Sequence, residues 1–206
     1  MKILAVGILF VLLMPEISAQ PFCFLDPNPG PFYSNGSSGA IYDVTSGDFN
    51  ADGSLDIVTA NSEASDISFI PGNGNGTLGT PDTTSLSGVL FCITSADFNG
   101  DGHLDVATTD GVSMYVLFGN GDGTFQSPNS YPAAASPSRL YATDINNDDR
   151  PDLLVAASGG VGVFIGQMGG SFMPIVLYST GGGGVRDLCV ADFDNDGILD
   201  IMSTTH

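Results

Sequence analysis

The ten residues Asp48-Phe49-Asn50-Ala51-Asp52-Gly53-Ser54-Leu55-Asp56-Ile57 occur four times, with small changes, along this chain of 206 residues. The later copies begin at Asp97, Asp144 and Asp192, so successive copies start 49, 47 and 48 residues apart. We call the four segments Asp loops 1 to 4 (residues 48–57, 97–106, 144–153 and 192–201). A regular period of this length indicates a repeat protein, in which one small structural unit is stacked several times.

A second, glycine-rich element keeps step with the Asp loops. Residues 72–77 (Gly-Asn-Gly-Asn-Gly-Thr) match residues 119–124, and residues 166–171 form a looser third copy. We call these segments the Gly turns.

The apolar runs between the two elements are short and bounded by Gly, Asn and Asp, which is typical of strands and tight turns. Each unit is expected to hold one strand into the Asp loop, a second out of it (Leu55 to Ala60, Leu104 to Thr109) and a third into the Gly turn. A fourth strand is expected to start near Leu78, Phe125 or Phe172. Four antiparallel strands in about 48 residues is the size of a β-propeller blade, so the chain is predicted to be all-β.

The composition supports this prediction and excludes other classes. The chain has 23 acidic and 4 basic residues, a formal net charge of −19, and 28 glycines. Gly and Asp favour turns over helices, which argues against a helical bundle. The shortage of basic residues argues against binding to nucleic-acid phosphates. Intrinsic disorder is also disfavoured, because 42% of the residues are hydrophobic and can form a core.

The Asp loops and Gly turns resemble the FG-GAP repeats, also called VCBS repeats, of integrin-α-type N-terminal β-propellers. The resemblance extends from about Pro31 to the end of the chain. It implies that each Asp loop is the hairpin between the first two strands of a blade and holds calcium. It also implies a ring of seven blades. Counted by strands, the chain holds three complete repeats and parts of others, so it is expected to be a fragment of such a ring rather than a finished four-bladed protein. The repeat units are expected at about 44–92, 93–139, 140–187 and, in part, 188–206.

The residue types in the Asp loops suit a calcium ion. Positions 1, 3, 5 and 9 of each loop are Asp or Asn, and calcium prefers six to eight oxygen ligands, many of them carboxylates. Position 7 is expected to supply its backbone carbonyl. The chain is therefore predicted to bind up to four Ca²⁺ ions. The predicted ligands are Asp48, Asn50, Asp52, Ser54 and Asp56 in loop 1, Asp97, Asn99, Asp101, His103 and Asp105 in loop 2, Asp144, Asn146, Asp148, Arg150 and Asp152 in loop 3, and Asp192, Asp194, Asp196, Ile198 and Asp200 in loop 4.

The four loops are not equivalent. Loop 4 has four carboxylates at the ligand positions and is expected to bind calcium most tightly. Loop 3 has Asp149 where the others have glycine, and Pro151 before its last ligand, so it is expected to be the weakest. An EF-hand is excluded, because it needs Glu at position 12, where these loops have Thr59, Thr108, Val155 and Ser203.

The first nineteen residues are predicted to be a secretory signal peptide. Lys2 is followed by an uncharged stretch from Ile3 to Leu13, and Ser18-Ala19 suits a cleavage site. The mature chain, residues 20–206, is therefore expected to be secreted, with no segment that inserts into a membrane.

Three cysteines, Cys23, Cys92 and Cys189, leave at least one thiol without a partner inside the chain, and no pairing can be assigned. Two tripeptides, beginning at Asn35 and Asn75, match the N-glycosylation sequon.

No motif in the chain indicates catalysis. Residues 74–79 match a dinucleotide-binding fingerprint, but Pro81 and a strand-like stretch follow where a helix is needed. No G-x-S-x-G elbow exists. The resemblance to integrin-type heads and to propeller lectins with the same repeat favours a non-catalytic extracellular module for adhesion to a protein or a glycan. The alternatives are an accessory propeller of a secreted polysaccharide-acting enzyme, or a purely structural matrix repeat. A ligand is expected on the connections opposite the Asp loops, which hold Arg139, Arg186, Tyr131 and Tyr178.

Overall fold

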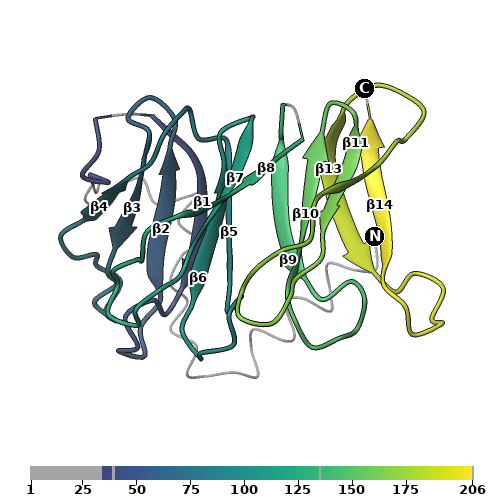
Figure 1. Cartoon of the computed structure of the whole chain (residues 1–206). Coiled ribbons are helices and arrows are strands. Elements are labelled where there is room, and N and C mark those ends of the chain that lie inside the picture. The colour runs from purple at the N-terminus through teal and green to yellow at the C-terminus, as the bar shows by residue number, and fades with distance from the viewer. Residues whose placement is uncertain (1–33, 39, 135, 206) are drawn as a thin grey trace, which may run out of the picture. The chain divides into compact units, whose positions relative to one another are not determined.

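The computed structural model describes residues 34–38, 40–134 and 136–205, so the predicted signal peptide and Cys23 lie outside the described part. The described residues form fourteen β-strands in antiparallel sheets and include no α-helix (Figure 1). The prediction of an all-β chain built of four-stranded blades is thus confirmed. No helix long and apolar enough to span a membrane occurs within these ranges.

Three sheets each contain four strands that are consecutive in the sequence, and a fourth sheet contains two strands. We call them blades 1 to 4. Blade 1 comprises β1 (Ile41–Gly47), β2 (Asp56–Asn61), β3 (Asp66–Ile70) and β4 (Asp82–Ser85). Blade 2 comprises β5 (Cys92–Ala96), β6 (Asp105–Thr109), β7 (Ser113–Leu117) and β8 (Asn129–Pro132). Blade 3 comprises β9 (Arg139–Thr143), β10 (Asp152–Ala157), β11 (Gly160–Phe164) and β12 (Val176–Tyr178), and blade 4 comprises β13 (Val185–Ala191) and β14 (Asp200–Thr205).

The fourth strand of each complete blade starts later than the sequence predicts. Leu78, Phe125 and Phe172 form isolated bridges to Gly72, Gly119 and Gly166, and the strands β4, β8 and β12 begin several residues further on. A proline lies between the bridge and the strand in every case, at Pro81, Pro128 and Pro174. Proline has no backbone N–H to donate, so it interrupts the ladder of hydrogen bonds at this point.

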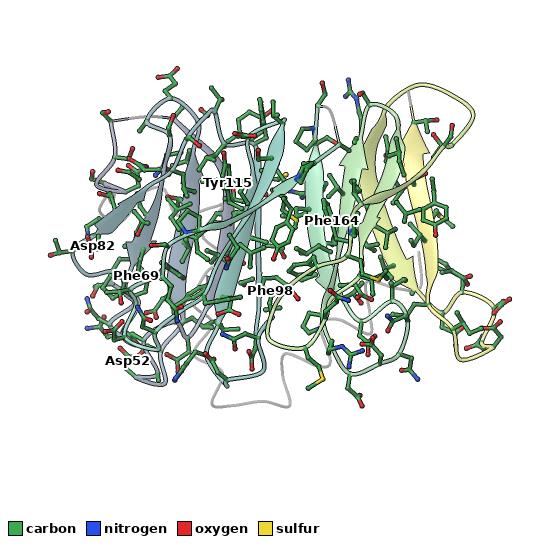
Figure 2. The ribbon with its side chains drawn as sticks, in the orientation of Figure 1. Asp52, Phe69, Asp82, Phe98, Tyr115 and Phe164 are labelled. Carbon is green, nitrogen blue, oxygen red and sulfur yellow. The ribbon has the colours of Figure 1, made fainter. Side chains whose placement is uncertain are left out.

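The hydrophobic core lies between neighbouring blades. One cluster joins blades 1 and 2 and includes Val58, Phe69, Val106 and Leu117. A second cluster joins blades 2 and 3 and contains Phe98 and Phe164, labelled in Figure 2. A third joins blade 3 to blade 4. Side chains from both faces of the central strands are therefore buried, which explains why β6 and β10 are buried along their whole length. Each fully buried large apolar side chain contributes about 1.5–3 kcal/mol to folding.

The topology places the two polar motifs of a blade together. An Asp loop joins the first strand to the second, and a Gly turn joins the third to the fourth, in blades 1 to 3. Because neighbouring strands are antiparallel, both connections lie at the same end of the blade. The connection between the second and third strands lies at the opposite end. The Asp loops are thus gathered at one end of the blades, beside the Gly turns.

Candidate metal centre

Asp loop 1 is folded around the side chains at its first, third and fifth positions. The amide of Asp52 donates to Oδ1 of Asp48 at 3.1 Å and to Oδ1 of Asn50 at 3.0 Å. Oδ2 of Asp48 accepts the amide of Gly53 at 2.9 Å, and Oδ1 of Asp52 accepts the amide of Ser54 at 2.7 Å. The oxygens of positions 1, 3 and 5 therefore converge within one tight turn.

The other three loops repeat this arrangement. In each, the amide at position 5 donates to Oδ1 at position 1, over 3.1, 3.0 and 3.1 Å in loops 2, 3 and 4. The amide at position 6 donates to Oδ2 of the same residue, over 2.8, 2.7 and 2.9 Å. Position 6 has a positive φ in all four loops, including loop 3, where Asp149 adopts 64° instead of a glycine. The loops thus share one backbone conformation, which the sequence repeat predicts.

The carboxylate at position 9 has a second role in blades 1 to 3. The side chains of Asp56, Asp105 and Asp152 are fully buried. Each accepts one amide from position 2 of its own loop and one from the first glycine of the Gly turn. A Cβ at Gly72 would overlap the carbonyl oxygen of Leu55, so glycine is needed for this close approach. These aspartates are predicted metal ligands, and they also join the Asp loop to the Gly turn, a contact that the sequence pattern did not predict.

These hydrogen bonds leave some lone pairs of the buried carboxylates free to bind a cation. A carboxylate has about four lone-pair sites, so a buried Asp that accepts two amides can still offer oxygen lone pairs to a metal ion. The donor set of each loop, made of carboxylate, amide and carbonyl oxygens, is the set that calcium prefers. The residues present therefore fit calcium chemically.

Burial disfavours ionisation of two of the position-9 carboxylates, Asp105 and Asp152. Desolvation raises the pKa of Asp105 to about 6, against hydrogen bonds from Gly119 and Phe98 that lower it, and Asp101 and Asp97 raise it further. Desolvation also raises the pKa of Asp152 above its ordinary value. At the exposed tip, the amide of His103 lowers the pKa of Asp101. A cation beside these groups would favour the ionised form of the buried carboxylate.

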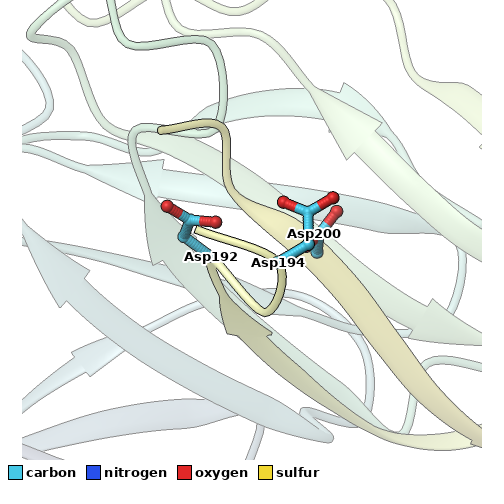
Figure 3. A group of neighbouring side chains, drawn as sticks. All are labelled: Asp192, Asp194 and Asp200. Atoms are coloured by element: carbon cyan, nitrogen blue, oxygen red, sulfur yellow. The ribbon is translucent and has the colours of Figure 1, made fainter. Parts of the chain in front are cut away.

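Loop 4 brings its carboxylates closest together. Among the described residues, one group of three acidic side chains offers oxygens that all lie within 4.8 Å of one another, namely Asp192, Asp194 and Asp200 (Figure 3). Asp200 is only partly buried and accepts one recorded amide, that of Phe193, at 3.1 Å. This is the loop expected to bind calcium most tightly.

Loop 3 contains a positively charged side chain, that of Arg150. The guanidinium of Arg150 forms an ion pair with the carboxylate of Asp148, the residue at position 5. The same carboxylate oxygen accepts Nδ2 of Asn146 at 3.0 Å. The sequence analysis assigned only a backbone carbonyl to Arg150 and overlooked its side chain. The available signal was a basic residue inside an acidic loop.

The residues expected to face a ligand at the opposite end differ in their surroundings. Arg139 lies 3.5 Å from Asp43 of blade 1 and 3.6 Å from Asp187 of blade 4, so its charge is engaged between blades. Tyr131 packs edge-to-face on Phe172, whereas Tyr178 is exposed. Arg139 is therefore a structural residue in this arrangement, and Tyr178 is accessible.

The two described cysteines are both free thiols in different environments. Cys92 is fully buried, with Sγ 3.1 Å from Oγ1 of Thr109. Cys189 is exposed on β13. Neither forms a disulfide within the described residues.

Comparison with known proteins gives three overlapping matches to a family model described as an FG-GAP-like repeat, over residues 48–108, 97–155 and 144–203. No curated protein matches the chain. The fold is similar to that of a lectin from Agrocybe aegerita that recognises non-reducing terminal N-acetylglucosamine, with 20% identity and a TM-score of 0.50. It is also similar to BBS1N in its complex with ARL6DN, with 13% identity and a TM-score of 0.58. The aligned region covers 79% and 85% of this chain but only 42% and 55% of those two chains.

Proposed function

Because the chain belongs to the FG-GAP-like repeat family, we propose that it is a secreted, calcium-binding β-propeller segment that acts as an extracellular binding module. The observation that carries the calcium proposal is the common geometry of the four Asp loops. In each, the side chain at position 1 is held by two backbone amides. Loop 4 adds a set of three carboxylates with oxygens within 4.8 Å of one another.

The proposed role of calcium is structural. The ion would be held by the residues at positions 1, 3, 5 and 9 and by the carbonyl at position 7, and it would neutralise carboxylates that otherwise repel one another. In blade 1, position 9 is Asp56, which already bonds to the Gly turn through Gly72. Calcium would therefore stabilise the hairpin of a blade together with its neighbouring turn. At tenfold excess over its dissociation constant, one such ion stabilises a fold by about 1.4 kcal/mol.

The proposed binding activity is non-catalytic and directed at a protein or a carbohydrate. Two solved relatives of the fold are described as a lectin and as part of a protein complex, which supports a binding role in general terms. We place the partner at the end of the blades opposite the Asp loops, because Tyr178, the last residue of β12, is exposed there and the Asp loops are proposed to bind calcium.

A calcium titration of the purified chain by calorimetry tests the metal proposal. We expect three or four bound ions and a lower melting temperature in chelator than in calcium. The double variant Asp192→Asn/Asp194→Asn should lose the tightest site. Glu63→Gln removes one charge from an exposed residue between β2 and β3 and serves as the control. A folded wild-type chain that binds no calcium would contradict the proposal.

The binding proposal needs a separate test. Immobilised glycans and candidate extracellular proteins should be probed with the calcium-loaded chain, and Tyr178→Ala should weaken any binding found. Equal binding by the wild type and the Tyr178 variant would place the partner elsewhere on the molecule. Secretion is tested by release of the full chain into the culture medium, with deletion of residues 2–19 as the control.

A further inference from the structure

The asparagines of the two sequons differ in exposure: Asn35 is buried and Asn75 is exposed. Asn35, the first residue of one, is only 8% exposed, and its Nδ2 donates to Oδ1 of Asn61 at 2.8 Å. Asn61 is itself fully buried, accepts Oγ1 of Thr59 and donates to Oγ of Ser68. A sugar on Nδ2 of Asn35 would have no space at this buried position. Asn35 cannot carry a glycan in the folded protein.

Asn75 lies at the tip of the Gly turn of blade 1 and is exposed. The neighbouring glycines Gly74 and Gly76 have φ of 67° and 86°, and a Cβ at Gly76 would meet nothing within 4 Å. Oδ1 of Asn75 accepts the amide of Thr77 at 3.0 Å and its hydroxyl at 2.7 Å. Among the described residues no acceptor is recorded for Nδ2 of Asn75, the atom to which a glycan is attached. The open tip leaves that atom accessible to an enzyme.

We propose that Asn75 is an N-glycosylation site and that Asn35 is not, an inference that rests on the proposed entry of the chain into the secretory pathway. The donor is an oligosaccharide linked to a membrane lipid through pyrophosphate, supplied by that pathway with its transferase. Nδ2 of Asn75 forms a bond to the anomeric carbon, the bond from that carbon to the pyrophosphate oxygen breaks, and one amide proton is released. The lipid pyrophosphate leaves, and the amide nitrogen keeps one hydrogen.

A glycan on Asn75 would affect where a partner can bind, because Asn75 lies close to Asp loop 1. A Cβ at Gly74 would lie 3.0 Å from Oγ of Ser54, so the turn tip lies directly beside Asp loop 1. A hydrated oligosaccharide at this tip covers the end of blade 1 that holds the Asp loop. A large partner is thereby directed to the opposite end of the blades, where the proposed function places it.

Blade 2 provides a matched gain-of-site control. Asp122 takes the place of Asn75 in its Gly turn, is exposed, and accepts the amide and hydroxyl of Thr124 at 3.0 and 2.5 Å. Gly123 has a φ of 84°, close to that of Gly76. The substitution Asp122→Asn therefore creates a second sequon at an exposed position with a similar backbone turn, although Gly123, unlike Gly76, is buried against the ring of Phe69.

The test is expression of the full chain in a eukaryotic secretory host, with mobility and peptide mass compared before and after treatment with peptide N-glycosidase. We expect one glycan on the wild type, none on Asn75→Gln or Thr77→Ala, one on Asn35→Gln, and two on Asp122→Asn. Release of the glycan converts the modified Asn to Asp, which identifies the residue. A secreted, folded chain without sugar on Asn75, or with sugar on Asn35, would overturn the inference.

A second version of the chain, with a standard signal peptide in place of residues 1–19, separates this inference from the proposed secretion. If only that version is secreted, and it carries the glycan on Asn75, the native leader prediction is wrong and the glycan site stands. If it is secreted without the glycan, the site assignment is wrong whatever the native leader does.

Discussion

Oδ1 of Asp56 accepts the backbone amide of Gly72 at 2.8 Å, across 16 residues of sequence. The same bond joins Asp105 to Gly119 at 2.8 Å and Asp152 to Gly166 at 2.7 Å. In each blade the other carboxylate oxygen accepts an amide of the Asp loop itself. One buried side chain thus connects the two polar motifs of a blade.

The substitution Asp56→Ala should destabilise the chain strongly even in chelator. It leaves two buried amides, those of Phe49 and Gly72, without an acceptor, and an unsatisfied buried donor costs about 1–3 kcal/mol. We expect a loss of about 2–5 kcal/mol in the free energy of unfolding, measured by urea denaturation. The exposed Asp82→Ala is the control. A loss no greater than that of the control would show that the bond contributes little.

The substitution Arg150→Ser should improve calcium binding by loop 3. It removes the guanidinium that pairs with Asp148 and supplies the residue that loop 1 has at position 7. We expect the affinity of the weakest site to rise by about tenfold, equivalent to about 1.4 kcal/mol. Calorimetry of the variant against Arg186→Ser, which removes the same charge from β13, checks this. In chelator, Arg150→Ser should melt below the wild type, because Asp148 then lacks its counter-charge.

The stability of the metal-free chain should fall as the pH rises from 3.8, the ordinary pKa of Asp105, through about 6, its raised pKa. The pKa of Asp105 is raised to about 6 from an ordinary value of 3.8, so the folded state binds more protons than the unfolded state in this window. Stability then decreases with rising pH. Saturating calcium should flatten the dependence, because a cation favours the ionised carboxylate.

Melting temperatures at pH 5 and pH 7, in chelator and in calcium, measure this pH effect. The variant Asp105→Asn should lose part of the dependence in chelator, and the remainder is expected from Asp152, whose pKa is also raised. A wild-type chain that melts at a higher temperature at pH 7 than at pH 5 in chelator would reverse the predicted sign.

The two described cysteines should differ sharply in reactivity. Burial raises the pKa of the Cys92 thiol to about 11, and the side chain is inaccessible. Cys189 is exposed. N-ethylmaleimide at neutral pH should therefore modify Cys189 in the native chain and Cys92 only after denaturation, as peptide mapping by mass spectrometry would show. Rapid modification of Cys92 in native conditions would mean that the interface of blades 2 and 3 opens readily.

The sequence predicted the features that are encoded locally. The strand–loop–strand unit follows from its period and from Asp and Gly at fixed positions, because the hydrogen bonds of an Asp loop are made within ten residues. The contacts that escaped prediction join residues distant in the chain. The bond from Asp56 to Gly72 and the buried pair Asn35–Asn61 depend on which strands meet, and nothing in the local pattern shows this. Prolines such as Pro81 are a local signal for the delayed fourth strands, because proline has no backbone N–H to donate.

The position of the core clusters determines how the chain should lose its structure. Each of the three clusters belongs to one pair of adjacent blades, so apolar packing couples a blade only to its immediate neighbours, while the ion pair of Arg139 with Asp43 links blades 3 and 1. Unfolding is then expected to be sequential, with the boundary between folded and unfolded chain moving one blade at a time. A destabilising substitution in the cluster between blades 1 and 2 should unfold blade 1 first, while the contact between blades 3 and 4 persists. Denaturation curves followed by probes in different blades should therefore separate, as they do in linear repeat arrays and do not in a two-state domain.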